Sequence, residues 1–159
     1  MKLPLNQALA KYQSSIYRAA FYICKNRHDA EDITQDTFLA YLNADDIFES
    51  EAHVRAWLLR VSVNKAKNLA TSFWHRNSQN IDDYLNTLTY EEPEESDLLR
   101  AVLKLPVKCR TIVHLYYYED YSIKEIADLL GISENTVKSQ MNRGRMLLKK
   151  MLKEEWEDD

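Results

Sequence analysis

Apolar residues recur three and four positions apart through most of the chain, which is the spacing of helices that bury one face. Up to residue 118, this spacing predicts helices over residues 5–26, 30–43, 51–76, 97–105 and 107–118. Asp29, Ser50 and Ser96 stand where the second, third and fourth of these helices would be capped. Two glycines and three prolines are too little turn chemistry for a β-sandwich or barrel. The pattern therefore indicates an all-α protein.

The segment from Tyr121 to Arg145 is predicted to form two short helices joined by a tight turn. Ser122 and Glu125 have the spacing of a capping box, in which each side chain bonds the other residue's backbone N–H. Gly131 follows the first helix, where the chain needs a positive φ, and Ser133 can cap the second helix. The apolar residues spaced to pack the two helices together are Ile126, Ala127, Leu130, Val137 and Met141. This arrangement is a helix-turn-helix.

Polar and cationic side chains fill the outward face of the second helix. No acidic residue occurs between Asn135 and Lys153, whereas an ordinary surface helix usually interleaves Glu with Lys. Because Lys and Arg bind phosphates and base edges, this face favours a nucleic-acid reader over a plain amphipathic helix. Its members are Asn135, Thr136, Lys138, Ser139, Asn142, Arg143 and Arg145.

Charge is segregated along the chain, although its formal net value is −4. Residues 53–80 include lysines and arginines but no acid, and residues 82–97 include acids but no base. The acidic stretch also loses the helical spacing and contains Pro93, so it is predicted to be a linker. We therefore predict two small helical domains, over residues 1–80 and 97–159, joined by residues 81–96.

Little in the chain suggests catalysis or a bound metal. Cys24 and Cys109 each lie alone in an apolar helical pattern, which predicts buried thiols in a reducing compartment. The histidines share no ligand spacing, and no nucleophile–base pair or phosphate-binding loop is evident. No signal peptide is evident, and no apolar run approaches the roughly 18 residues that a membrane span needs. We expect a cytoplasmic protein that is not an enzyme and uses no cofactor.

Two helices of the first domain carry candidate binding faces. Asp32, Gln35 and Asp36 share one helical face, which suits docking of a basic partner better than metal or acid–base chemistry. The third helix mixes aromatic, amide and basic side chains without an acid, as expected where unstacked bases meet aromatic rings and phosphates meet cations. Trp57 is in phase with the core and is expected to pack there. The remaining candidates are Asn64, Lys65, Lys67 and Asn68.

Taken in order, several segments of the chain resemble the extracytoplasmic-function sigma factors of bacterial RNA polymerase. They are Asp29 to Phe38, Ala56 to Asn64, the acidic linker, and the run from Leu105 through Arg145. The resemblance covers nearly the whole chain. It implies a sigma region 2-like bundle and a sigma region 4-like helix-turn-helix domain joined by the acidic linker. Such a subunit directs core polymerase to promoters and helps to melt them.

The resemblance also implies a role for each candidate face. The second helix would bind the β′ coiled coil of the polymerase through Asp32, Gln35, Asp36, Phe38 and Leu42. The third helix and the loop before it would recognise the −10 element and hold a flipped base, through Phe48, Asn64, Lys65, Lys67 and Asn68. The helix-turn-helix would read the −35 element through Thr136, Lys138, Ser139, Asn142, Arg143, Arg145 and Lys149. The implied partners are core RNA polymerase, through its β′ coiled coil and β flap, promoter DNA, and an anti-sigma factor, which in this family is often membrane-bound.

Two features depart from the pattern of the relatives. The loop over residues 43–50 has no Arg or Lys. The third helix ends in the run from Phe73 to Arg76, where relatives often carry an Asp followed later by paired arginines.

A free-standing helix-turn-helix regulator is the alternative function, with the first domain serving dimerisation or ligand sensing. Such a regulator would footprint an operator alone, whereas a sigma factor would need core polymerase.

Overall fold

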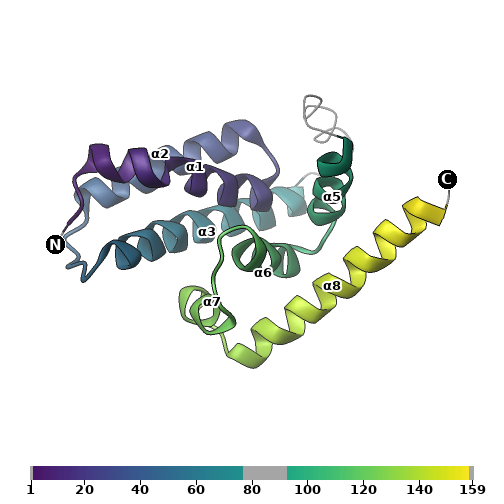
Figure 1. Ribbon diagram of the computed structural model, residues 1–159. Coiled ribbons are helices and arrows are strands. Elements are labelled where there is room, and N and C mark those ends of the chain that lie inside the picture. Colours follow the sequence, from purple (N-terminus) through teal and green to yellow (C-terminus); the bar gives the residue numbers. More distant parts are fainter. Residues whose placement is uncertain (1, 77–92, 158–159) are drawn as a thin grey trace. The chain divides into compact units, whose positions relative to one another are not determined.

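The protein is all-α, as predicted. The computed structural model describes residues 2–76 and 93–157, with side chains over 2–72 and 98–153 (Figure 1). No strand occurs in these ranges. The helices are α1 (Leu5–Cys24), α2 (Arg27–Asn43), α3 (Glu51–Arg76), α5 (Pro93–Leu103), α6 (Val107–Tyr117), α7 (Ile123–Leu130) and α8 (Glu134–Glu157). Residues 81–92 of the predicted linker lie outside the described residues.

Helix α2 begins earlier than predicted because its cap is Asn26. The Asn26 side chain accepts a hydrogen bond from the backbone N–H of Asp29 at 3.0 Å, so the expectation that Asp29 is the cap was wrong. Ser50 does cap α3, since its Oγ accepts from the N–H of His53 at 3.1 Å. Helix α5 begins at Pro93, which places Ser96 inside the helix instead of before it. Proline suits a first helical position because its missing N–H has no partner there.

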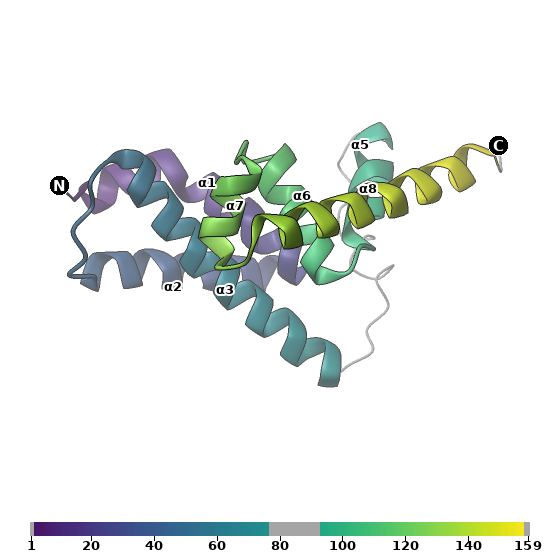
Figure 2. The ribbon, with the colours of Figure 1, turned by 90° about the horizontal axis from the view of Figure 1, so that it is seen from below.

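The chain divides into two compact units, residues 1–72 and 73–159. In the first unit, α1 and α2 pack side by side, and the first half of α3 runs along them (Figures 1 and 2). The core between these helices is built from small and branched side chains, which allow the helices to approach closely. Its buried members include Ile16, Ala19, Ile23, Ile33, Leu58, Leu59 and Val63.

In the second unit, α8 packs against α5, α6 and α7. Gly144 lies at the crossing of α8 with α6, where an added Cβ would come within 3.0 Å of Val113 Cγ2. Cys109, also on α6, is buried at this crossing and donates through Sγ to Gln140 Oε1 at 3.1 Å. A residue larger than glycine at position 144 would therefore require the Val113 side chain to shift by a few tenths of an ångström in a closely packed crossing.

Arg110, His114 and Glu119 are buried in the second unit, although the apolar pattern did not mark them. Arg110 Nη1 donates to the carbonyl oxygens of Leu105 at 2.6 Å and Leu103 at 3.4 Å. The Arg110 guanidinium thereby caps the C-terminal end of α5. His114 Nε2 lies 3.2 Å from Glu119 Oε1, and both side chains are almost completely buried. These contacts fix the short connection between α5 and α6 and the end of α6, because buried charges need partners.

The two cysteines differ in burial. Cys109 is buried as predicted, but Cys24 is only half-buried, with Sγ 3.5 Å from the carbonyl oxygen of Asn26. Cys24 ends α1, where Lys25 takes the left-handed conformation with φ +62°, so it lies at the edge of the core. Within the described part of the chain, no helix is both long and apolar enough to span a membrane.

Candidate nucleic-acid interface

The predicted helix-turn-helix is present, and both of its helices are capped as expected. Ser122 and Glu125 form the capping box, with the Glu125 N–H donating to Ser122 Oγ at 3.1 Å and the Ser122 N–H donating to Glu125 Oε1 at 3.0 Å. Gly131 ends α7 in the left-handed conformation with φ +69°. Ser133 Oγ then accepts from the N–H of Thr136 at 3.1 Å and caps α8. Local sequence therefore sets where both helices begin and how the chain turns between them.

Apolar side chains on its inner face hold the first part of α8 in place. Val137 and Met141 are buried, as are Ile126 and Ala127 on the facing surface of α7. Four of the five predicted anchor residues are thus confirmed, whereas Leu130 is only half-buried and its neighbour Leu129 is buried instead. Because one face of α8 is fixed in this way, the opposite face is presented as a rigid row of polar side chains.

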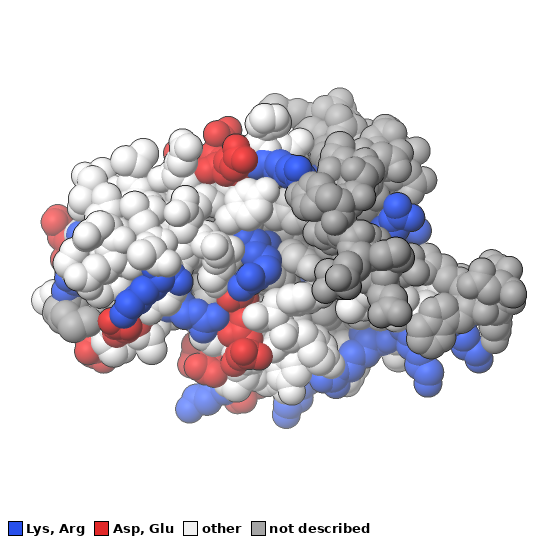
Figure 3. Space-filling model, turned by 45° about the horizontal axis from the view of Figure 1, so that its top comes forward, with Lys and Arg blue, Asp and Glu red and all other residues white. Residues whose placement is uncertain are grey.

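Most of the predicted −35 residues lie on this exposed face of α8. Lys138, Ser139, Asn142, Arg143 and Lys149 are all exposed. Lysine and arginine side chains follow one another along the lower edge of the view in Figure 3, where α8 runs. Thr136 is exposed too, but its N–H and hydroxyl both bond Ser133 Oγ, the hydroxyl at 2.8 Å. Thr136 therefore takes part in the cap of α8.

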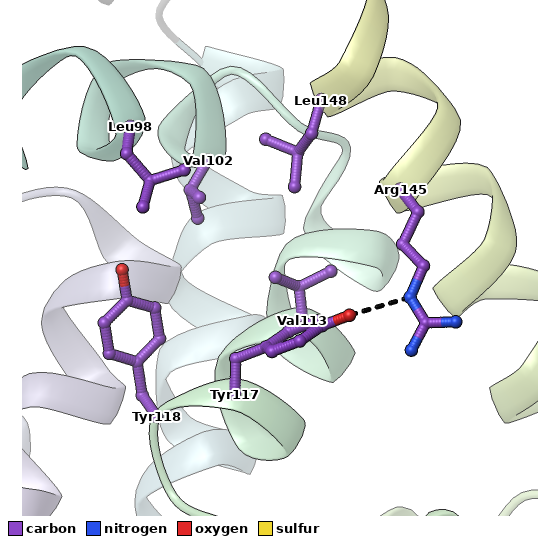
Figure 4. A pocket seen from close by; sticks show the side chains of 7 residues that line it. All are labelled: Leu98, Val102, Val113, Tyr117, Tyr118, Arg145 and Leu148. Carbon is purple, nitrogen blue, oxygen red and sulfur yellow. Dashed lines mark hydrogen bonds between the residues drawn. The ribbon is translucent and has the colours of Figure 1, made fainter. Parts of the chain in front are cut away.

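Arg145 is held against α6 by two tyrosines. Its Nε donates to Tyr117 Oη at 2.8 Å, and its guanidinium lies 5.7 Å from the ring centroids of both Tyr116 and Tyr117 (Figure 4). A guanidinium fixed over aromatic faces loses less freedom when it binds a phosphate, and its other N–H groups stay available. The geometry suits a backbone contact better than base reading.

An apolar pocket of about 420 Å³ lies beside Arg145, between α5, α6 and α8. Figure 4 shows the apolar side chains directed into it and Arg145 at its edge. None of the predicted site residues except Arg145 contributes to this pocket. Its lining residues are Leu98, Val102, Val113, Tyr117, Tyr118, Arg145 and Leu148.

In the first unit, α3 divides into a buried and a polar face. Ala66, Val63 and Leu59 are buried, whereas Asn64, Lys65 and Asn68 are exposed and Lys67 is half-buried. Helical spacing puts residues 64, 65 and 68 on neighbouring positions of one face. The structure thus brings these three predicted −10 residues together, with Lys67 at the border of the face.

Phe48 lies in the core, which differs from the expectation that it contacts DNA. Its side chain is only 1% exposed, and its ring centroid lies 5.5 Å from that of Tyr41 and 5.9 Å from that of Trp57. Trp57 packs there as predicted, and its Nε1 donates to Asp46 Oδ2 at 3.0 Å. Ile47, next to Phe48, is 83% exposed. Ile47 is therefore the large apolar residue of this loop that a ligand can reach.

The α2 face is partly as predicted. Asp32, Gln35 and Asp36 are exposed on one side of the helix, and Leu42 is exposed beyond them. Phe38 is only 4% exposed, so it supports the core and cannot serve as a contact residue. Leu39 is 56% exposed, follows Gln35 by four positions and was missed. Helical phase alone would have found it, because positions four apart share a face.

The described residues contain no group of three or more His, Cys, Asp or Glu side chains that could hold a metal ion. Burial raises the pKa of the Cys109 thiol above its ordinary value, so the thiolate form needed for nucleophilic chemistry is disfavoured. The candidate sites therefore consist of exposed binding faces on α2, α3 and α8 and of the loop before α3.

Two parts of the chain match known protein families. Residues 9–76 match the family described as Sigma-70 region 2, and residues 95–148 match Sigma-70, region 4. The SigW ECF RNA polymerase sigma factor of Bacillus subtilis is 32% identical over 90% of this chain and 86% of that protein. The RNA polymerase sigma factor SigV of the same organism is 27% identical over 97% and 94%.

Two solved structures share the fold. One shows the sigma factor RpoE in complex with the anti-sigma factor NepR from Bartonella quintana, with a TM-score of 0.71 and 21% identity over 93% of this chain and 96% of that chain. The other shows CnrH in complex with the cytosolic domain of CnrY, with a TM-score of 0.69 and 25% identity over 94% and 87%. Together with the matched regions and the SigW likeness, these findings show that the chain belongs to the extracytoplasmic-function sigma factors of the sigma-70 family.

Proposed function

We propose that this sigma factor recognises its promoters through two separate faces and docks on core RNA polymerase through a third. Residues 1–80 would bind the polymerase and the −10 element, residues 81–96 would link the domains, and residues 97–159 would bind the −35 element. The protein would act in the cytoplasm without catalysing a reaction, because selectivity comes from binding alone.

The single observation that best supports this proposal is the exposed face of α8. Lys138, Ser139, Asn142 and Arg143 are exposed along one side of a helix whose opposite side is fixed by Val137 and other buried residues. A helix held in this way can enter a major groove, where Lys and Arg donate to guanine and Asn bonds adenine. Arg145, held by Tyr117, and Lys149 would contact the flanking phosphates.

The −10 element would be read by the first unit. Asn64, Lys65 and Asn68 form an exposed amide and basic face on α3, bordered by Lys67. The amides can bond base edges and the lysines can neutralise phosphates. The loop before α3 would contact a flipped base through Ile47, while Phe48 supports it from the core.

Core polymerase would dock on α2. Asp32, Gln35 and Asp36 are exposed there, and Leu39 and Leu42 add exposed apolar surface. An acidic patch with an apolar centre suits a partner helix that carries basic and apolar side chains. The resemblance assigns this partner as the β′ coiled coil and gives the second domain the β flap.

An anti-sigma factor is proposed as a further partner. One solved structure with this fold was obtained with an anti-sigma factor, and the other with the cytosolic domain of CnrY. A membrane-bound partner of this kind would hold the sigma factor inactive until a signal released it.

The proposal is tested by transcription in vitro from a library of genomic fragments, with core polymerase alone and with core plus this protein. We expect start sites that appear only with the protein and share one pair of upstream elements. No new start sites, together with a footprint by the protein alone, would instead establish a free-standing regulator. A matched reaction with Lys138→Ala should give weaker starts at the same promoters.

A further inference from the structure

The loop over residues 44–50, which joins α2 to α3, is fastened at both ends. At its start, Lys2 Nζ donates to the carbonyl oxygen of Ala44 at 2.9 Å and lies 5.1 Å from the Tyr41 ring centroid. At its end, the N–H of Glu49 donates to His53 Nδ1 at 3.1 Å. The path of the loop is therefore set by contacts with the N-terminal segment and with α3.

Trp57 fastens the middle of the same loop. Its Nε1 donates to Asp46 Oδ2 at 3.0 Å, and its ring packs edge-on against Phe48 and Tyr41 with centroids 5.9 Å apart in each case. Phe48 is buried beneath the loop. One tryptophan thus holds the residue before Ile47 by a hydrogen bond and the residue after it by packing.

Ile47 is consequently presented in a fixed direction. It is 83% exposed between two held neighbours, and its β-branched side chain has few rotamers. A side chain ordered before binding loses little entropy when a ligand covers it, so such contacts discriminate better than mobile ones. Without the hydrogen bond to Asp46, Ile47 would sample several directions.

The charges of the loop indicate what it can bind. Asp45, Asp46 and Glu49 are exposed acids, and no Lys or Arg lies between residues 43 and 50. Carboxylates repel phosphates, whereas Ile47 offers apolar surface to the face of a base. The loop therefore suits an unpaired base better than a DNA backbone.

We infer that Trp57 is a positioning residue for −10 recognition: its hydrogen bond to Asp46 holds the loop so that Ile47 meets the unpaired base. This inference rests on the proposed function, which places the loop at the −10 element. Trp57 acts through Asp46 and Ile47 and does not itself touch DNA.

Three variants separate the hydrogen bond from charge and bulk. Trp57→Phe keeps an aromatic ring but removes the Nε1 donor, and Asp46→Ala removes the acceptor. Asp46→Asn removes the charge but keeps a side-chain oxygen that can accept from Trp57. Asp45→Ala is the matched control, because it removes a neighbouring charge and leaves the Trp57 contact intact.

The experiment uses full-length protein with core polymerase on a promoter library randomised at both elements. For Trp57→Phe and Asp46→Ala, we expect discrimination at the −10 element to fall about threefold to tenfold, the size expected for one hydrogen bond. Preference at the −35 element and affinity for core should stay unchanged. Asp46→Asn and Asp45→Ala should match the wild type.

Several outcomes would overturn the inference. An unchanged −10 profile for both Trp57→Phe and Asp46→Ala would show that the contact does not position the loop. An Asp46→Asn variant as defective as Asp46→Ala would assign the effect to charge. Equal losses at both elements would indicate general destabilisation, and Asp46→Ala decides the test if Trp57→Phe fails to fold. Wild-type protein that directs no new start sites would refute the proposed function itself.

Discussion

Replacing Phe48 with alanine should destabilise the first unit without removing any DNA contact. The ring is 1% exposed and packs against Tyr41, His53 and Trp57, so its loss leaves a cavity. Truncation of a buried Phe costs about 3–5 kcal/mol. The first unit comprises residues 1–72, and such a unit is stabilised by about 4–11 kcal/mol at typical values per residue. Phe48→Ala should therefore take away a large share of its stability.

Urea denaturation of the full-length chain, followed by hydrogen exchange of peptides from α2 and α3, measures this loss separately from the second unit. Ile47→Ala is the matched control, since an 83% exposed residue should change stability by less than about 0.5 kcal/mol. Phe48→Leu should fall between the two, because it keeps most of the buried volume. If Phe48→Ala unfolded at the wild-type urea concentration, the ring would not be part of the core, and a direct role at DNA would have to be considered again.

Three further predictions concern the faces of α2, α6 and α8. Lys138→Ala should weaken promoter use by about 1–3 kcal/mol if Lys138 reads a base, as measured by transcription from matched and mismatched −35 elements. Lys108→Ala, at an exposed position on α6, is the charge control. Equal losses on every duplex would make Lys138 a phosphate contact. Asp36→Arg should lower affinity for core polymerase in a binding titration, whereas Asp128→Arg on α7 should not, and an unchanged affinity would remove α2 from the docking surface. Burial raises the pKa of the Cys109 thiol, so its alkylation, followed by mass spectrometry, should begin at higher pH than that of an ordinary thiol. Because the unfolded chain loses this proton at lower pH than the folded chain, the free energy of unfolding should also fall as the pH rises through the ordinary thiol range. An alkylation rate at Cys109 equal to that of a free thiol would contradict its burial.

The helix-turn-helix could be predicted almost completely because its determinants are local. The capping box of Ser122 and Glu125, the positive φ of Gly131 and the cap at Ser133 each involve residues within a few positions of one another. The start of α2 shows the limit of such signals. Asn26 and Asp29 are both good caps three residues apart, and only the structure shows that Asn26 is the one used.

Burial of single residues in loops and of polar side chains could not be predicted in this way. Phe48 stands outside any helix, so no helical phase indicates which way it points, and its burial depends on Tyr41 and Trp57 from two different helices. Arg110 is buried because its side chain bonds the carbonyl oxygen of Leu105 in the connection between α5 and α6, and hydrophobic periodicity does not record a bond of this kind. Leu39 differs from these cases, since its exposure follows directly from the helical phase of α2.

The net charge of −4 is a poor guide to what α8 can bind, because charges act locally in salt solution. Lys138 and Glu154 are separated by about 24 Å along the helix at about 1.5 Å per residue. Charges in water are screened over about 8 Å at physiological ionic strength, so the acidic end of the chain barely affects the field at Lys138. Between these residues α8 carries only basic charges, among them Arg143, Arg145 and Lys149, on one continuous helix. An acidic protein can therefore present a basic reading face on the part of α8 that follows Glu134, because the acids at the end of the chain lie more than a screening length away.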